Sequence, residues 1–157
     1  LPRGRDTRSI YGFNYRMTEM QAVIAKEQLK KLDYIVNENK KRYQILDQNI
    51  DTGVLKRAIP DKCDIIYDTF IFFIDDKNIR KKIIEVLSKF KFGTKNLPDA
   101  VEWHCSFYWS HMMSKNQIKR SKISKNILEN SIAIPILINK PLKSYHNLII
   151  AINNLVK

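Results

Sequence analysis

The sequence predicts an α+β fold, in which a long connecting helix precedes a small domain whose helices pack on one face of a few-stranded, mainly antiparallel sheet. Two observations carry this prediction. Apolar residues first recur at helical spacing over roughly 33 residues, without a glycine or proline between them. Runs of β-branched and aromatic residues then alternate with shorter amphipathic segments. We therefore expect a lead-in loop over residues 1–16, a connecting helix over 17–52 and a small C-terminal domain over 53–157.

The predicted connecting helix begins at a capping box formed by Thr18 and Gln21. Its apolar positions are spaced by threes, fours and one seven, which places them along one face: Ala22, Ala25, Leu29, Leu32, Val36, Tyr43, Leu46 and Ile50. With a rise of 1.5 Å per residue, such a helix would be about 50 Å long. A helix of this length typically bridges two bodies or pairs with a partner.

The small domain is predicted to contain a β-α-β unit, an irregular aromatic segment and an α-β-α unit. The run 65–74 is typical of a buried strand, and Asp75 or Asp76 can cap the next helix. The remaining predicted elements are a helix over 79–90, a turn at 92–94 leading into a short strand that stops before Pro98, an irregular segment over 99–113, a helix over 123–131, a strand over 132–138 and a helix over 144–156.

The composition favours a folded chain and argues against several classes of protein. Hydrophobic residues make up 44% of the chain, and its longest apolar runs are too short to cross a membrane. The Arg-rich start lacks the apolar stretch of a signal peptide and does not begin with Met, so we expect an internal fragment or a processed chain. Because the two cysteines, Cys63 and Cys105, are far apart, we expect no disulfide framework and a cytoplasmic location.

The net charge of +12 comes from 28 Lys and Arg against 16 Asp and Glu. These basic residues are spread over the whole chain, with only loose clusters at 40–42, 80–82 and 115–125. Solvated surfaces explain such a distribution better than a nucleic-acid interface does, so we do not expect nucleic acid as a partner. A general attraction of anionic ligands is compatible with this charge.

The stretch Gly12-Phe13-Asn14-Tyr15-Arg16 combines a flexible turn with side chains that can donate to an oxyanion. A helix begins directly after it and adds free amides and a positive dipole end. This pattern predicts contact with a phosphate or carboxylate through Asn14 and Arg16. The alternative, in which both side chains only satisfy the turn and the preceding loop, is equally open at this point.

The stretch 103–111 contains two tryptophans, a tyrosine and two histidines. Flat aromatic side chains stack on sugar rings, so this density indicates a ligand-lining surface, although a core or subunit-interface cluster is an equally open alternative. His104, Cys105 and His111 lack the further ligands of a zinc site, and no partner orients a Cys-His pair, so no metal ligand and no catalytic residue is assigned. The candidate substrate contacts are Tyr15, Trp103, His104, Trp109 and His111.

The N-terminal motifs resemble those of the DegT/DnrJ/StrS family of sugar aminotransferases. The resemblance rests on Gly4-Arg5-Asp6, Gly12 to Met17, Gln21-Ala22 and Gln28 to Asp33. It continues more loosely through Phe92-Gly93-Thr94 and Ala133-Ile134-Pro135-Ile136, and so extends over nearly the whole chain. Where relatives commonly have His-Tyr-Pro at the substrate site, this chain has Asn96-Leu97-Pro98 followed by Trp103 and His104.

The resemblance implies a fold type I enzyme that depends on pyridoxal phosphate (PLP) and works as a homodimer with shared active sites. Asn14 would reach the PLP phosphate of the neighbouring subunit, with Arg16 nearby. The family's Schiff-base lysine lies in a domain upstream of residue 1, so this chain is expected to be the C-terminal part of the enzyme and inactive alone. Its partners would be an amino-acid donor and a keto sugar, expected to be nucleotide-linked and used in surface polysaccharide or amino-sugar biosynthesis.

Two alternatives stay open on the sequence. One is a non-catalytic module that dimerises through the long helix or binds nucleic acid through its basic residues. The other is a family member that dehydrates its sugar, because the position that separates dehydration from transamination lies outside this chain.

Overall fold

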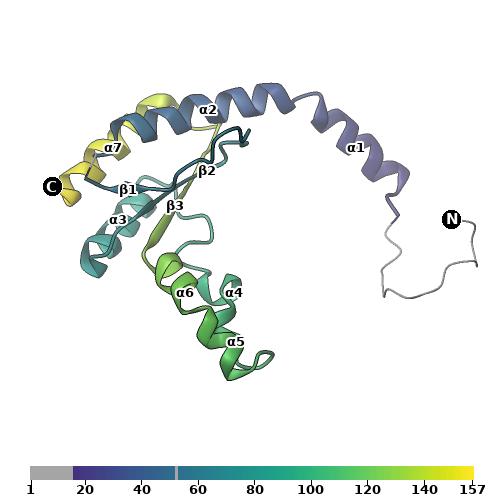
Figure 1. Ribbon diagram of the computed structural model, residues 1–157. Coiled ribbons are helices and arrows are strands. Elements are labelled where there is room, and N and C mark those ends of the chain that lie inside the picture. Colours follow the sequence, from purple (N-terminus) through teal and green to yellow (C-terminus); the bar gives the residue numbers. More distant parts are fainter. Residues whose placement is uncertain (1–15, 52) are drawn as a thin grey trace, which may run out of the picture. The chain divides into compact units, whose positions relative to one another are not determined.

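The computed structural model describes residues 16–51 and 53–157 (Figure 1). The chain divides into two compact units, residues 1–33 and 34–157. The first unit contributes the helix α1 (Glu19–Leu29), and α2 (Leu32–Asn49) begins at its end. All described strands belong to the second unit. The predicted lead-in loop lies outside the described residues except for Arg16.

The structure has two helices, α1 and α2, where the spacing predicted a single one. The helix is interrupted at Lys30 and Lys31, where the Lys31 amide donates to the Gln28 carbonyl at 3.0 Å. No residue of α1 is buried, whereas α2 buries Tyr43 and Leu46. The apolar spacing runs through the interruption unchanged, so periodicity alone could not locate it.

The sheet is antiparallel throughout, with the order β1-β2-β3. Its strands are β1 (Leu55–Lys56), β2 (Thr69–Phe73) and β3 (Ser131–Pro135). Phe70 lies opposite Ile134 and Phe72 lies opposite Ile132, so these four fully buried side chains share one face. The predicted α+β class is therefore confirmed.

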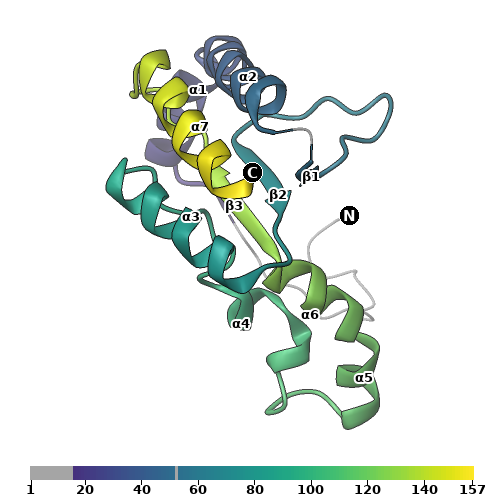
Figure 2. The same ribbon diagram turned by 90° about the vertical axis from the view of Figure 1, so that its left-hand side faces the viewer.

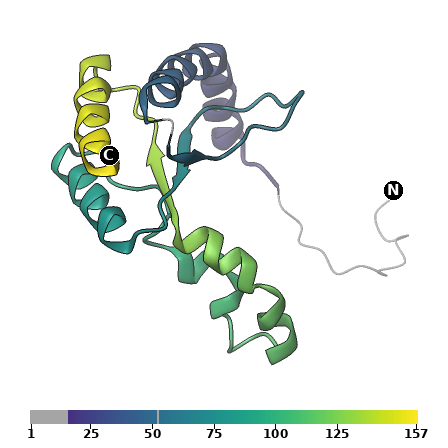
Figure 3. The same cartoon turned by 60° about the vertical axis from the view of Figure 1, so that its left-hand side comes forward.

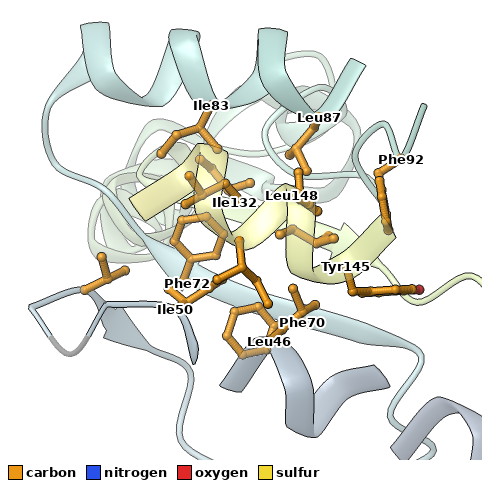
Figure 4. Close-up of a cluster of buried hydrophobic side chains, with 14 of the residues drawn as sticks. Leu46, Ile50, Phe70, Phe72, Ile83, Leu87, Phe92, Ile132, Tyr145 and Leu148 are labelled. Carbon is orange, nitrogen blue, oxygen red and sulfur yellow. The ribbon is translucent and has the colours of Figure 1, made fainter. Parts of the chain in front are cut away.

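Residues from α2, α3 (Lys77–Lys89) and α7 (Leu142–Val156) complete the hydrophobic core with that face of the sheet. Figure 4 shows how they meet: Ile83 and Leu87 of α3 face Leu148 of α7, and Leu46 of α2 lies beneath the rings of β2. The helices α3 and α7 lie side by side in Figures 2 and 3. The core places α7 over the sheet. The described segment that precedes β3 contributes no residue to this core.

A run of short helices comes directly before β3 in the chain and extends from the beginning of that strand, as Figures 2 and 3 show. Its members are α4 (Val101–His104), the 3₁₀ turn η1 (Ser106–Tyr108), α5 (Lys115–Arg120) and α6 (Lys122–Glu129). Val101 and Cys105 are buried. The hydroxyls of Ser106 and Ser121 are 2.6 Å apart and join the turn to α6. The predicted helix over 123–131 corresponds to α6, whereas α5 was not predicted.

Two predicted strands differ from the structure. The run 65–74 is strand only at Thr69–Phe73, because Tyr67 has a φ of 52° that an extended ladder does not accept. The turn at 92–94 is present, with Gly93 at a φ of 67°, but no strand follows it before Pro98. The residues after it still pair with β3: the Lys95 amide donates to the Ala133 carbonyl at 2.9 Å, and the Ala133 amide donates to the Leu97 carbonyl at 3.1 Å.

Candidate functional site

Arg16 is the described member of the predicted anion-contact motif, and its side chain is exposed just before α1. Gly12, Asn14 and Tyr15 lie outside the described residues. The capping box predicted after the motif is present: the Thr18 amide donates to Gln21 Oε1 at 2.9 Å, and the Gln21 amide donates to Thr18 Oγ1 at 3.3 Å. The helix therefore begins shortly after Arg16, as the capping box predicted.

The helix α1 presents large apolar side chains to solvent. Met20, Val23 and Ile24 have exposed fractions of 75%, 62% and 57%, and their spacing places them on one side of the helix. An exposed apolar surface of this kind is typical of a segment that packs against another domain or another subunit.

The structure brings three of the predicted substrate contacts together. Trp103, Trp109 and His111 line one hollow of about 550 Å³, together with Glu102, Tyr108 and Met112. Trp103 is 82% exposed, whereas Trp109 is half-buried and its indole Nε1 donates to the Glu102 carbonyl at 3.2 Å. One tryptophan is thus fixed in the wall and the other is free to meet a ligand.

His104 does not belong to this group. It lines a separate pocket of about 290 Å³ with Arg57, Asp68, Lys95 and Asn96. Consecutive residues of a helix point about 100° apart, so α4 turns Trp103 and His104 to different surroundings. His104 therefore lines a different pocket from Trp103, Trp109 and His111, and its contact with a substrate stays a prediction.

The His104 pocket carries mixed charge. The Lys95 ammonium forms an ion pair with the Asp68 carboxylate. Partial burial raises the pKa of Asp68, but the hydrogen bond and the charge of Lys95 together outweigh that effect, so the net pKa lies below its ordinary value. Asp68 therefore stays ionised in the neutral range and neutralises part of the positive charge that Lys95 and Arg57 bring to the pocket.

Tyr108 and Glu129 form a second polar contact near the tryptophans. The Tyr108 hydroxyl donates to Glu129 Oε1, and Lys125 Nζ lies 3.6 Å from the same oxygen. The hydrogen bond to the carboxylate raises the pKa of Tyr108 to about 12. The sequence missed this pair, because Glu129 is 21 residues away on an otherwise ordinary amphipathic helix.

Among the described residues, no three His, Cys, Asp or Glu side chains gather closely enough to hold a metal ion. Cys105 is buried at 3% exposure, whereas His104 and His111 are exposed. The part of the chain that the structure covers also contains no helix both long and apolar enough to cross a membrane.

A model of the DegT/DnrJ/EryC1/StrS aminotransferase family matches residues 3–149. The chain belongs to this family. The aminotransferases of the DegT/DnrJ/EryC1/StrS family depend in general on PLP, and family members are generally dimeric. No curated protein matches the chain.

Solved structures share the fold of this family member. One is named "Putative sugar aminotransferase Spr1654 from Streptococcus pneumoniae, PMP-form"; it is 15% identical with a TM-score of 0.64 over 88% of this chain and 35% of its own. Another is 3-amino-5-hydroxybenzoic acid (AHBA) synthase, which is 17% identical with a TM-score of 0.67 over 97% of this chain and 43% of its own. The chain therefore spans less than half the length of these two structures.

Proposed function

We propose that this chain is the C-terminal part of a PLP-dependent aminotransferase that moves an amino group from an amino acid to a keto sugar. The family match over residues 3–149 is the observation that carries the proposal. The fold shared with a protein named as a sugar aminotransferase supports it. The keto sugar is expected to be nucleotide-linked and to serve surface polysaccharide or amino-sugar biosynthesis in the cytoplasm.

The described residues fit a phosphate at the N-terminal end of this chain. The exposed Arg16 guanidinium can donate to an oxyanion. The capping box already uses the amides of its own two residues, so within the first turn the amides of Glu19 and Met20 are the ones that could face an anion. PLP, when bound, supplies an electron sink for the substrate carbon. The proposed part of this chain is to hold that phosphate through Asn14 and Arg16, in the active site of the partner subunit.

The aromatic segment is proposed to orient the sugar. Trp103, Trp109 and His111 offer flat rings and an imidazole along one hollow, and His104 faces the pocket of Lys95 and Asp68. Tyr15 remains a proposed substrate contact. None of these residues supplies the Schiff-base lysine, so the chain alone is proposed to be inactive.

The test uses the complete protein in which this chain is joined to its upstream domain. The complete protein is incubated with PLP, a ¹⁵N-labelled amino-acid donor and a panel of nucleotide-linked keto sugars, and mass spectrometry follows the label. We expect ¹⁵N to enter one sugar, and the 157-residue chain alone to transfer none. Loss of sugar oxygen without uptake of ¹⁵N would show a dehydratase, and transfer by the chain alone would refute its proposed inactivity.

The shared active site has its own test. Two variants of the complete protein are made separately, Asn14→Ala and one that lacks the Schiff-base lysine, and are then mixed so that dimers of both kinds of subunit form. If Asn14 serves the partner subunit, each variant alone is inactive, and mixed dimers regain part of the activity because one of their two sites is intact. A mixture that stays inactive, although native mass spectrometry detects mixed dimers, would place Asn14 in the site of its own subunit.

A further inference from the structure

Two neighbouring hollows meet at α4 and share the side chains of Glu102, Trp103 and Tyr108. The first, of about 830 Å³, lies between α4 and the beginning of α3. The second, of about 550 Å³, contains Trp109, His111 and Met112. Trp103 borders both and is 82% exposed. We call the two hollows together the Trp103 cleft.

The wall of the Trp103 cleft is held in place before any ligand arrives. The Trp109 indole donates to the Glu102 carbonyl, and the Tyr108 hydroxyl donates to Glu129. The Tyr108 ring packs edge-on against Phe107 with centroids 5.5 Å apart. A free indole beside a fixed aromatic wall is the arrangement that binds flat, partly apolar ligands.

The charges around the cleft decide which ligands fit. Although the chain carries a net charge of +12, three cations in the first hollow face four carboxylates. The cations are Lys77, Arg80 and Lys81, and the carboxylates are Glu85, Asp99, Glu102 and Glu129. The Arg80 guanidinium already donates to the Ile74 carbonyl and to Asn130 Oδ1. Lys125 adds a fourth cation beside this hollow, because its Nζ lies 3.6 Å from Glu129 Oε1. A phosphate or a sugar acid placed here would therefore meet no net positive charge, despite the net charge of the chain.

An uncharged ring rich in hydroxyls needs no net positive charge to bind. Its hydroxyls can donate to Glu102 and Asp99 and accept from Lys77 or Lys81, while its C–H face packs on the Trp103 indole. We propose that the Trp103 cleft binds an uncharged pyranose ring through stacking on Trp103 and hydrogen bonds to Glu102 and Asp99. The inference rests on the proposed function in taking this ring as part of the sugar substrate, but the binding itself needs no amino transfer.

The chain has two tryptophans, and both line the cleft, so intrinsic fluorescence reports on it directly. The 157-residue chain is titrated with methyl α-glucoside, methyl α-mannoside and N-acetylglucosamine, and separately with glucuronate and UDP. We expect a saturable, salt-insensitive change with at least one uncharged sugar, and binding of glucuronate and UDP weaker by about tenfold or more.

Variants separate stacking from general surface effects. Trp103→Ala abolishes the saturable change, with Trp109 left as the reporter, and Trp103→Phe retains part of it because a ring remains. Ile123→Ala is the control, since Ile123 is a similarly exposed apolar residue, 74% accessible, on α6. It leaves sugar binding unchanged.

Four results would overturn the proposal. One is a lack of response to every uncharged sugar, and another is a salt-sensitive response to glucuronate or UDP alone. The third is unchanged binding by Trp103→Ala. The last is a blue shift that depends only on protein concentration, which would show that a second copy of the chain covers the cleft. A failure of this kind leaves the ¹⁵N transfer result untouched, so the two proposals fail independently.

Discussion

Arg42 joins two segments that are 96 residues apart in the sequence. Its side chain is 8% exposed, and Nη2 donates to the carbonyls of Ile138 at 2.9 Å and Lys140 at 3.3 Å. Nη1 donates to Glu38 Oε2 at 2.7 Å. Lys41 pairs with the other Glu38 oxygen at 2.5 Å, but its side chain is 61% exposed. Arg42 and Lys41 therefore pair with the same carboxylate, but the Arg42 side chain is buried and the Lys41 side chain is exposed.

Arg42→Met is expected to lower the free energy of unfolding by about 2–3 kcal/mol, because three carbonyls lose a donor at a largely buried position while the apolar stem is kept. Lys41→Met is the matched control and should change the same quantity by about 0.5 kcal/mol or less, since exposed ion pairs contribute little. Urea denaturation of both variants checks this. Equal losses in the two variants would contradict the structural role of Arg42.

At the level of helices and strands, local signals predicted well and distant ones did not. Asp76 caps α3 as predicted, with Oδ1 accepting from the amides of Asn78 and Ile79 at 2.7 and 2.9 Å. The strand β1 was missed, because its two residues become a strand only by pairing with Phe72 and Phe73. No pattern in the neighbouring sequence predicts such a pairing.

The same difference between local and distant signals holds for the candidate site. The density of aromatic residues over 103–111 indicated a ligand-lining surface, and Trp103, Trp109 and His111 line one hollow. It could not predict that His104 faces Lys95 and Asp68, or that Glu129 receives the Tyr108 hydroxyl, since both depend on how α4 and α6 pack. The roles of these residues toward a substrate remain predictions.

The Asp76 cap makes part of the stability depend on pH. Hydrogen bonds from the Ile79 and Asn78 amides lower the pKa of Asp76 below 3.8. Its contribution is therefore present above the unfolded pKa and is lost as pH falls through the lower folded pKa. Asp76→Asn, which keeps an acceptor but cannot titrate, should flatten the fall in melting temperature between about pH 5 and pH 2.

Asp76→Ala should instead lower the melting temperature at every pH, because the cap itself is gone. Asp61→Asn, which changes an exposed loop carboxylate, is the control and should keep the wild-type curve. Thermal melts across the acid range supply the comparison. An acid limb in Asp76→Asn as steep as that of the unchanged chain would rule out this contribution of the cap.

The end of α2 depends on a side chain from the other end of the second unit. Asn153 of α7 accepts from the Asp51 amide at 3.1 Å and donates to the Asn49 carbonyl at 2.9 Å. Asn153→Ala should lower the free energy of unfolding by about 1–2 kcal/mol, since two hydrogen bonds are lost. The adjacent Asn154 is exposed, and Asn154→Ala should stay within about 0.5 kcal/mol. Chemical denaturation that finds the reverse order would exclude this link between the two helices.

For the molecule as a whole, the core and the surface differ between the two units. The second unit has its own core, whereas α1 buries no residue and exposes Met20, Val23 and Ile24. The chain covers 35% and 43% of two of the solved structures that it matches. The enzyme proposed above would account for both observations.

The central claim is that the complete protein is a PLP-dependent aminotransferase to which this chain contributes one end of a shared site. Visible absorbance of the purified protein tests it most directly. The complete protein should hold PLP with a visible band that excess glutamate or glutamine bleaches and a keto sugar restores, and the 157-residue chain mixed with PLP should develop no such band. A complete protein whose PLP band neither amino acid bleaches, or a bleachable band in the 157-residue chain alone, would contradict the claim.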